Sequence, residues 1–381
     1  MATIDIFNPV NVDLTISVPQ VTDVSTHNVA MVTSRTLPGS VVYKLYTNVT
    51  DFIVDFPADT APEENSWGTQ FYANNEAGNL FAINTPVPDS DVSVVVSTAI
   101  LNALALIAAD ATISPINSFY LVSAANGDEL FYSDVQVVAE LTNLEASGKP
   151  LLFIAQSYST TMFNDLAGFA PAVYLKNTSL KSLAVGMCGY PSLVSEPVVP
   201  KVSAGVCGFL SQIDIDNGTQ GALTGQTFFD VTPLQVGSTD VYSTVFTTTK
   251  INTLVNAQVN MYVRYQNQTQ FNIGLCMAPE EIPIDYYIYR QLIEETLRNT
   301  IKPYFFPNQL PYTNATITLI HGLIQNELNK FVDAGIMLPG FTIVDPVLDF
   351  SAPNPRTLKF QITGQLGARV YTINIGGNLQ G

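Results

Sequence analysis

The chain has 381 residues, of which 47% are hydrophobic and only 12% are charged, and its formal net charge is −17. Ordinary soluble domains carry roughly 25% charged residues, so we expect this surface either to be buried by assembly or to be neutral and polar. Because Lys and Arg form no cluster anywhere in this acidic chain, the composition excludes nucleic acid as a direct partner.

The cysteines and the N-terminus indicate a protein that stays in a reducing compartment. Cys188, Cys207 and Cys276 form no CxxC pair and are too few for a disulfide framework, so we expect free, buried thiols. The first residues lack the basic region and apolar core of a signal peptide.

Residues 1–20 predict an N-terminal arm. Residues 11–18 alternate polar with apolar side chains, and a proline stands on either side of this run. The alternation places four aliphatic side chains on one face of a strand: Val12, Leu14, Ile16 and Val18.

Residues 21–110 predict a β-rich front part, a possible outer or peripheral domain. Short strands are expected within 41–56 and 70–84, separated by a polar loop from Ala58 to Gly68 that holds the only tryptophan, Trp67.

Residues 92–109 contain no charge, and the length of this uncharged run, 18 residues, is the lower limit for a membrane-spanning helix. Polar residues interrupt the run, and its flanks carry aspartates instead of basic anchors. We therefore predict a buried strand over 92–96 that leads into a core helix over 97–109, and no membrane insertion.

The middle of the chain predicts an α/β segment. Strands are expected at 119–123, 151–155 and 172–175, and a helix opens at the capping box Ser133–Gln136 and ends at Gly148. Alternation of strands with helices predicts a small parallel sheet.

Beyond this segment, residues 190–240 look loop-rich because of their prolines and glycines. Strands return at 259–264 and 270–275.

The last hundred residues predict two helices followed by two strands. The first helix begins at Pro283 and stops at Pro303. The second begins at Thr313–Asn314 and ends at Gly335. Their apolar stripes are Tyr286, Tyr289, Ile293, Leu297 and Ile301 in the first, and Ile317, Ile320, Ile324, Leu328 and Phe331 in the second.

The two strands cover 358–363 and 369–375. A strand so near the end of the chain must pair with something. It either completes this subunit's own sheet or reaches into that of another subunit.

No motif in the sequence indicates catalysis. His27 and His321 have no partner at metal-ligand spacing, and no GxGxxG, GxSxG or HExxH pattern occurs. The adjacent acids Glu294 and Glu295 point about 100° apart on a helix and form ordinary surface pairs with nearby arginines. We predict no catalytic, cofactor-binding or metal-binding residue, and we do not expect an enzyme.

An ordered series of segments carries a resemblance to a known family. It comprises residues 256–264 at the entry to a strand, Ile284–Asp285 at the opening of a helix, 310–314 before the next helix, the turn 335–340 and the terminal strand 367–375. In this order, over about two thirds of the chain, they resemble the tail sheath proteins of contractile-tailed bacteriophages, in their divergent sheath-like branch.

The resemblance implies a structural subunit and no enzyme. Such subunits polymerise into stacked hexameric rings around a tail tube and contract to drive the tube through the host envelope. Expected partners are further copies, the tail tube protein, and the baseplate and tail terminator proteins. The expected location is the phage tail of the virion, after assembly in the host cytoplasm.

The fold implied is mixed α/β, with a sheath core over 111–350 and with C-terminal strands and a linking arm over 351–381. Strand arms at both ends of the chain are expected to add to the sheets of neighbouring subunits. The expected subunit-linking residues are Val12, Leu14, Ile16, Val18, Val370, Tyr371, Ile373 and Ile375. Two alternatives remain: these strands belong to the subunit's own sheet, or the chain is another virion component, a tube-associated or baseplate protein with a similar core.

Overall fold

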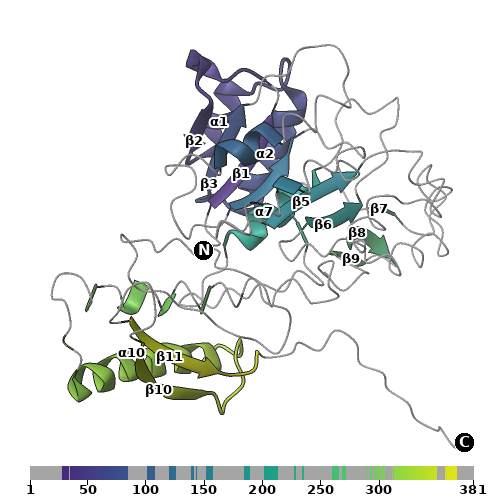
Figure 1. Cartoon of the computed structure of the whole chain (residues 1–381). Helices are drawn as coiled ribbons and strands as arrows, with labels where there is room; N and C mark the ends of the chain where they lie inside the picture. The colour runs from purple at the N-terminus through teal and green to yellow at the C-terminus, as the bar shows by residue number, and fades with distance from the viewer. Residues whose placement is uncertain are drawn as a thin grey trace, which may run out of the picture.

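The computed structural model combines a large mixed sheet, helices packed against it, and a separate C-terminal unit (Figure 1). The mixed α/β class predicted from the sequence is confirmed. The structure describes residues 28–33, 35–84, 101–107, 120–125, 139–140, 143, 152–157, 184–188, 201–212, 227–228, 234–235, 260–265, 268–271, 289, 292–293, 296–297, 299–301, 303–304, 311, 313–349 and 357–366.

Nine strands form the large sheet, in the order β2-β3-β1-β4-β5-β6-β8-β7, with β9 also paired to β8. Only β2 on β3 and β9 on β8 are antiparallel, and every other pair is parallel. The strands are β1 (Asn28–Thr33), β2 (Tyr43–Tyr46), β3 (Asn79–Asn84), β4 (Tyr120–Ala124), β5 (Leu152–Ser157), β6 (Ala184–Cys188), β7 (Leu234–Gln235), β8 (Asn260–Tyr265) and β9 (Gln268–Phe271).

The centre of this sheet is buried, which is consistent with its parallel pairing. Residues 29–33 of β1 and 80–84 of β3 are all buried, as expected for parallel strands covered on both faces. β1 lies between β3 and β4, so strands of the front part and of the α/β segment share one sheet. The domain limits proposed from the sequence stay a prediction.

Several predicted strands are confirmed. β4, β5 and β8 match the strands expected at 119–123, 151–155 and 259–264, and β9 covers the start of the one expected at 270–275. β6 was not predicted, and it pairs parallel with β5. The strands expected at 92–96 and 172–175, and the capping box Ser133–Gln136, lie outside the described residues.

The front part departs most from expectation, because the polar loop predicted from Ala58 to Gly68 is wrong. Helix α2 (Pro62–Asn74) runs through most of it. Pro62 is a favoured first helical residue, and the acids that follow it suit the positive end of a helix. Trp67 is fully buried on α2, and its ring stacks on that of Phe71 with 5.8 Å between the ring centroids.

The strands expected over 41–56 and 70–84 are also shorter than predicted. Helix α1 (Val49–Asp55) occupies the second half of the first range, and Asn48 caps it by accepting the Asp51 N–H at 2.9 Å. The second range begins within α2, and only 79–84 is strand.

Helix α7 (Val202–Leu210) lies in the range expected to be loop-rich, so that prediction is wrong there. Eight of its nine residues are buried, and it packs against α2, β4 and β5. A helix that is buried on all sides has no polar face and therefore no amphipathic period to detect.

The apolar segment 92–109 contains the expected core helix. Residues 101–107 are helical, and Ala103, Leu104 and Ile107 are buried. Among the described residues, no helix has the length and apolar character needed to cross a membrane.

The helix predicted from Pro283 is confirmed at each of its described residues, which are helical between 289 and 301. Four members of its stripe are buried, namely Tyr289, Ile293, Leu297 and Ile301. The predicted stop at Pro303 is wrong, because Pro303 and Tyr304 are helical too. Proline lacks the N–H, but its fixed φ is compatible with a helix.

The C-terminal unit consists of α10 (Asn314–Asp333) and a two-stranded antiparallel sheet of β10 (Thr342–Asp349) and β11 (Thr357–Thr363). The Thr313 hydroxyl caps α10 by accepting the Thr316 N–H at 3.2 Å, and Gly335 follows the helix with φ 73°. The predicted helix is thus confirmed, except that Ile317 is only partly buried.

β11 confirms the strand predicted at 358–363. β10 was not predicted, and it contains Pro346, a residue that cannot donate a hydrogen bond to a neighbouring strand. The register shifts between Val344 and Val347, where two residues of β10 oppose one of β11. This β-bulge accommodates the proline.

Candidate assembly interface

The eight subunit-linking residues predicted from the sequence all lie outside the described residues. This holds for both arms: Val12, Leu14, Ile16 and Val18 at one end, and Val370, Tyr371, Ile373 and Ile375 at the other. The strand expected over 369–375 is likewise untested. Two surfaces formed by the described residues are candidates for an interface.

The first such surface is the sheet of the C-terminal unit. Within the described part of the chain, β10 and β11 pair only with each other, and a bridge between Met337 and Leu366 extends the pairing. One face of this sheet packs on the hydrophobic core through Ile343, Phe360 and Ile362. Two strands alone are marginally stable, so the outer edges can accept further strands.

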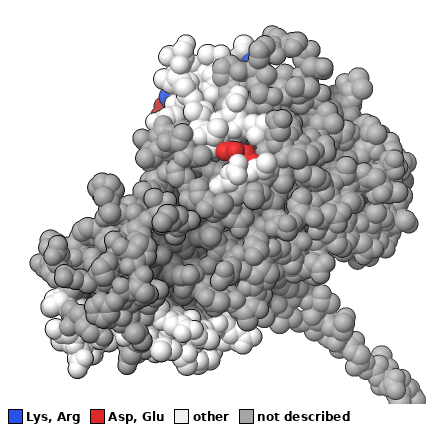
Figure 2. Space-filling model, in the orientation of Figure 1, with Lys and Arg blue, Asp and Glu red and all other residues white. Residues whose placement is uncertain are grey.

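The second surface is a corner of the large sheet where β2, its edge strand, meets α1. Five aliphatic side chains are exposed on these two elements and on the segment before β2: Val41, Val42, Leu45, Ile53 and Val54. Lys44 and Tyr46 of β2 face α1, so Leu45 between them faces away from it. In the orientation shared by Figures 1 and 2, the surface over β2 and α1 is nearly all uncharged. The sequence does not indicate these exposures, because an apolar run predicts a strand or helix and does not tell which of its side chains stay at the surface.

Asp55 ties the two elements of this corner together. Its Oδ2 accepts a hydrogen bond of 2.6 Å from the Tyr46 hydroxyl and also binds the Lys44 ammonium group. Burial, and then the hydrogen bond to Asp55, raise the pKa of Tyr46, so its phenol stays protonated.

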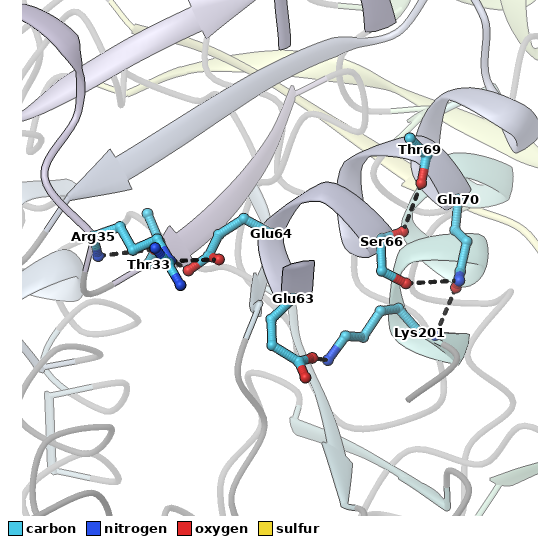
Figure 3. Close-up of polar contacts among 8 residues, drawn as sticks. All are labelled: Thr33, Arg35, Glu63, Glu64, Ser66, Thr69, Gln70 and Lys201. Atoms are coloured by element: carbon cyan, nitrogen blue, oxygen red, sulfur yellow. Dashed lines mark hydrogen bonds and ion pairs between the residues drawn. The ribbon is translucent and has the colours of Figure 1, made fainter. Parts of the chain in front are cut away.

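A polar cluster that includes two carboxylates and two cations joins β1, α2 and α7 (Figure 3). Glu64 on α2 is fully buried. Its Oε1 accepts a 2.7 Å hydrogen bond from the Thr33 hydroxyl at the end of β1, and its Oε2 lies 3.0 Å from Arg35 Nε. This carboxylate is therefore held by a donor and a cation.

The same cluster connects α2 to α7. The Lys201 ammonium group binds the carboxylate of Glu63 (Figure 3). The backbone N–H of Lys201 donates a hydrogen bond to the side-chain oxygen of Gln70. Lys201 is 1% exposed. Since each carboxylate already has a cationic partner, the arrangement fits a link between β1, α2 and α7 better than a site that exchanges protons.

The described residues offer little for metal or thiol chemistry. They contain no group of three or more His, Cys, Asp or Glu side chains that could hold a metal ion. Cys207 on α7 is a free, buried thiol, as predicted, and burial raises its pKa, which disfavours the reactive thiolate.

No family model matches this chain, and no curated protein matches its sequence. Solved structures do match. A chain from the six-fold symmetrised baseplate of the anti-feeding prophage has a TM-score of 0.64 and 11% identity, over 97% of this chain and 98% of that one.

Two further matches come from contracted sheaths. A chain of the helical sheath of the anti-feeding prophage has a TM-score of 0.59 and 15% identity, over 99% of this chain and 97% of that one. A chain of the PVC sheath complex, an extracellular contractile injection system, has a TM-score of 0.58 and 9% identity, over 99% of both chains. The chain therefore has the fold of contractile sheath proteins, which confirms, at the level of the fold, the resemblance drawn from the sequence.

Proposed function

We propose that this chain is the structural subunit of a contractile sheath, one that polymerises into stacked hexameric rings around an inner tube and contracts to drive the tube through a cell envelope. The observation that carries the proposal is the likeness in fold to two contracted sheath chains over 99% of this chain. A likeness in fold that is confined to one domain is compatible with many functions. The likeness to the two sheath chains instead covers nearly the whole chain, including the C-terminal unit.

The composition supports the same proposal. Only 12% of the residues are charged, which suits a surface that neighbouring copies cover. Contraction of such a lattice needs no nucleotide, because the free energy can be stored in a metastable extended assembly. We accordingly propose a non-enzymatic role.

The linking elements in this proposal are the two strand arms. Val12, Leu14, Ile16 and Val18 would add one strand to a neighbour, and Val370, Tyr371, Ile373 and Ile375 would add another. The edges of the β10–β11 sheet are suitable acceptors, since pairing there uses main-chain hydrogen bonds. Contacts of this head-to-tail kind propagate into rings and helices.

The tail tube, baseplate and tail terminator proteins are the partners that this role requires. A phage tail, assembled in the host cytoplasm, is the location we favour on the sequence resemblance. The fold suits an extracellular injection system equally well, because the matched chains come from such a system and from the anti-feeding prophage.

A second candidate function is a baseplate or tube-associated protein. The match to a chain of the anti-feeding prophage baseplate, with a TM-score of 0.64, favours it. The two candidates differ in assembly geometry, because a sheath subunit forms long hollow tubes and a baseplate subunit forms finite rings.

Electron microscopy of the purified chain at increasing concentration tests the proposal. Long hollow tubes with a helical surface lattice are the expected result. Finite rings at every concentration would favour the baseplate function, and a chain that stays monomeric even with tube protein added would count against both.

The arms are tested in the same assay by deleting residues 367–381, which we expect to abolish tubes. A matched control keeps the length and changes polar side chains of the same strand, Thr372→Ser with Asn374→Ser. Tubes that persist after the deletion would contradict the linking role of the C-terminal arm.

A further inference from the structure

We draw no further inference here: the strongest candidate, the outer face of the β10–β11 sheet, where the uncharged side chains of Thr342, Val344, Gln361 and Thr363 are exposed, carries no proposal because nothing in the structure shows what covers it.

Discussion

The ammonium group of Lys201, at the start of α7, binds the carboxylate of Glu63 on α2, a residue 138 positions earlier in the chain. The Lys201 side chain is 1% exposed and that of Glu63 is 30% exposed, so the ion pair is largely shielded from water. It joins the front part of the chain to a helix that contacts β4 and β5.

Removing the buried cation should destabilise the subunit. We expect Lys201→Met to lower the free energy of unfolding by about 1–3 kcal/mol, because Glu63 is left without its partner in a partly buried place. Lys330→Met is the matched control, since Lys330 is 56% exposed and pairs with Glu327 one turn away. Its effect should stay below about 1 kcal/mol. Urea denaturation of the unassembled chain measures both, and equal effects would contradict the structural role of Lys201.

The close approach of α7 to α2 makes Gly208 sensitive to a single methyl group. A Cβ at this position would lie 2.7 Å from the backbone oxygen of Phe71 and 2.9 Å from Asn74 Cβ. Gly208→Ala should therefore cost about 1–3 kcal/mol of stability. Gly322→Ala in α10 meets no atom within 4 Å and should stabilise by up to about 1 kcal/mol. Thermal unfolding compares them, and a shift of the same sign in both would refute the packing argument.

Burial of Cys207 predicts slow alkylation that does not accelerate with pH. Its thiol pKa is raised by burial, so raising the pH from about 7 to about 9 should produce no thiolate at this site, whereas an exposed thiol with a pKa near about 8.5 would ionise. Iodoacetamide labelling followed by peptide mass mapping gives the rate at Cys207 alone. Fast labelling of the native chain would show that α7 opens readily.

Tyr46→Phe should weaken the junction of β2 with α1. The lost hydrogen bond to the Asp55 carboxylate predicts a cost of about 1–2 kcal/mol near neutral pH. The pKa of Tyr46 is higher in the folded chain than in the unfolded chain. The stability that this difference provides is therefore complete below the unfolded pKa of about 10. It is lost as the pH rises above that value, because only the unfolded chain ionises there. Denaturation between pH 7 and pH 11 should show a shallower loss of stability in the variant. If stability fell with pH equally steeply in the variant and the unmodified chain, the raised pKa of Tyr46 would not contribute to stability.

The contrast between α10 and α7 shows which helices a sequence can predict. The local signals of α10 suffice: a threonine cap, an apolar stripe and a terminal glycine. α7 has none of them, because its sequence is apolar or small on every side and its helical form depends on α2 and the sheet around it. β10 was not predicted either, and the bulge that accommodates its Pro346 forms only on pairing with β11, which local sequence does not show.

The candidate interface was predictable only in part. Alternation predicts the arm strands from sequence, and these strands stay a prediction because they lie outside the described residues. The exposed aliphatic side chains of β2 and α1 gave no such signal, since Leu45 and Val54 are of residue types that also fill protein cores. Leu45 lies on β2, which is the edge strand, and strand order is a long-range property that local patterns do not contain.

The place of β1 in the sheet has a mechanical consequence for an assembly joined through its arms. Tension on residues 1–27 would enter the sheet at Asn28, the first residue of β1. β1 is held on both sides, by β3 along all six of its residues and by β4 along five. Since both neighbours run parallel to it, a pull along the strand axis loads these hydrogen bonds together in shear instead of breaking them one at a time. In an assembly joined in this way, the sheet would carry tension from one subunit to the next without unravelling.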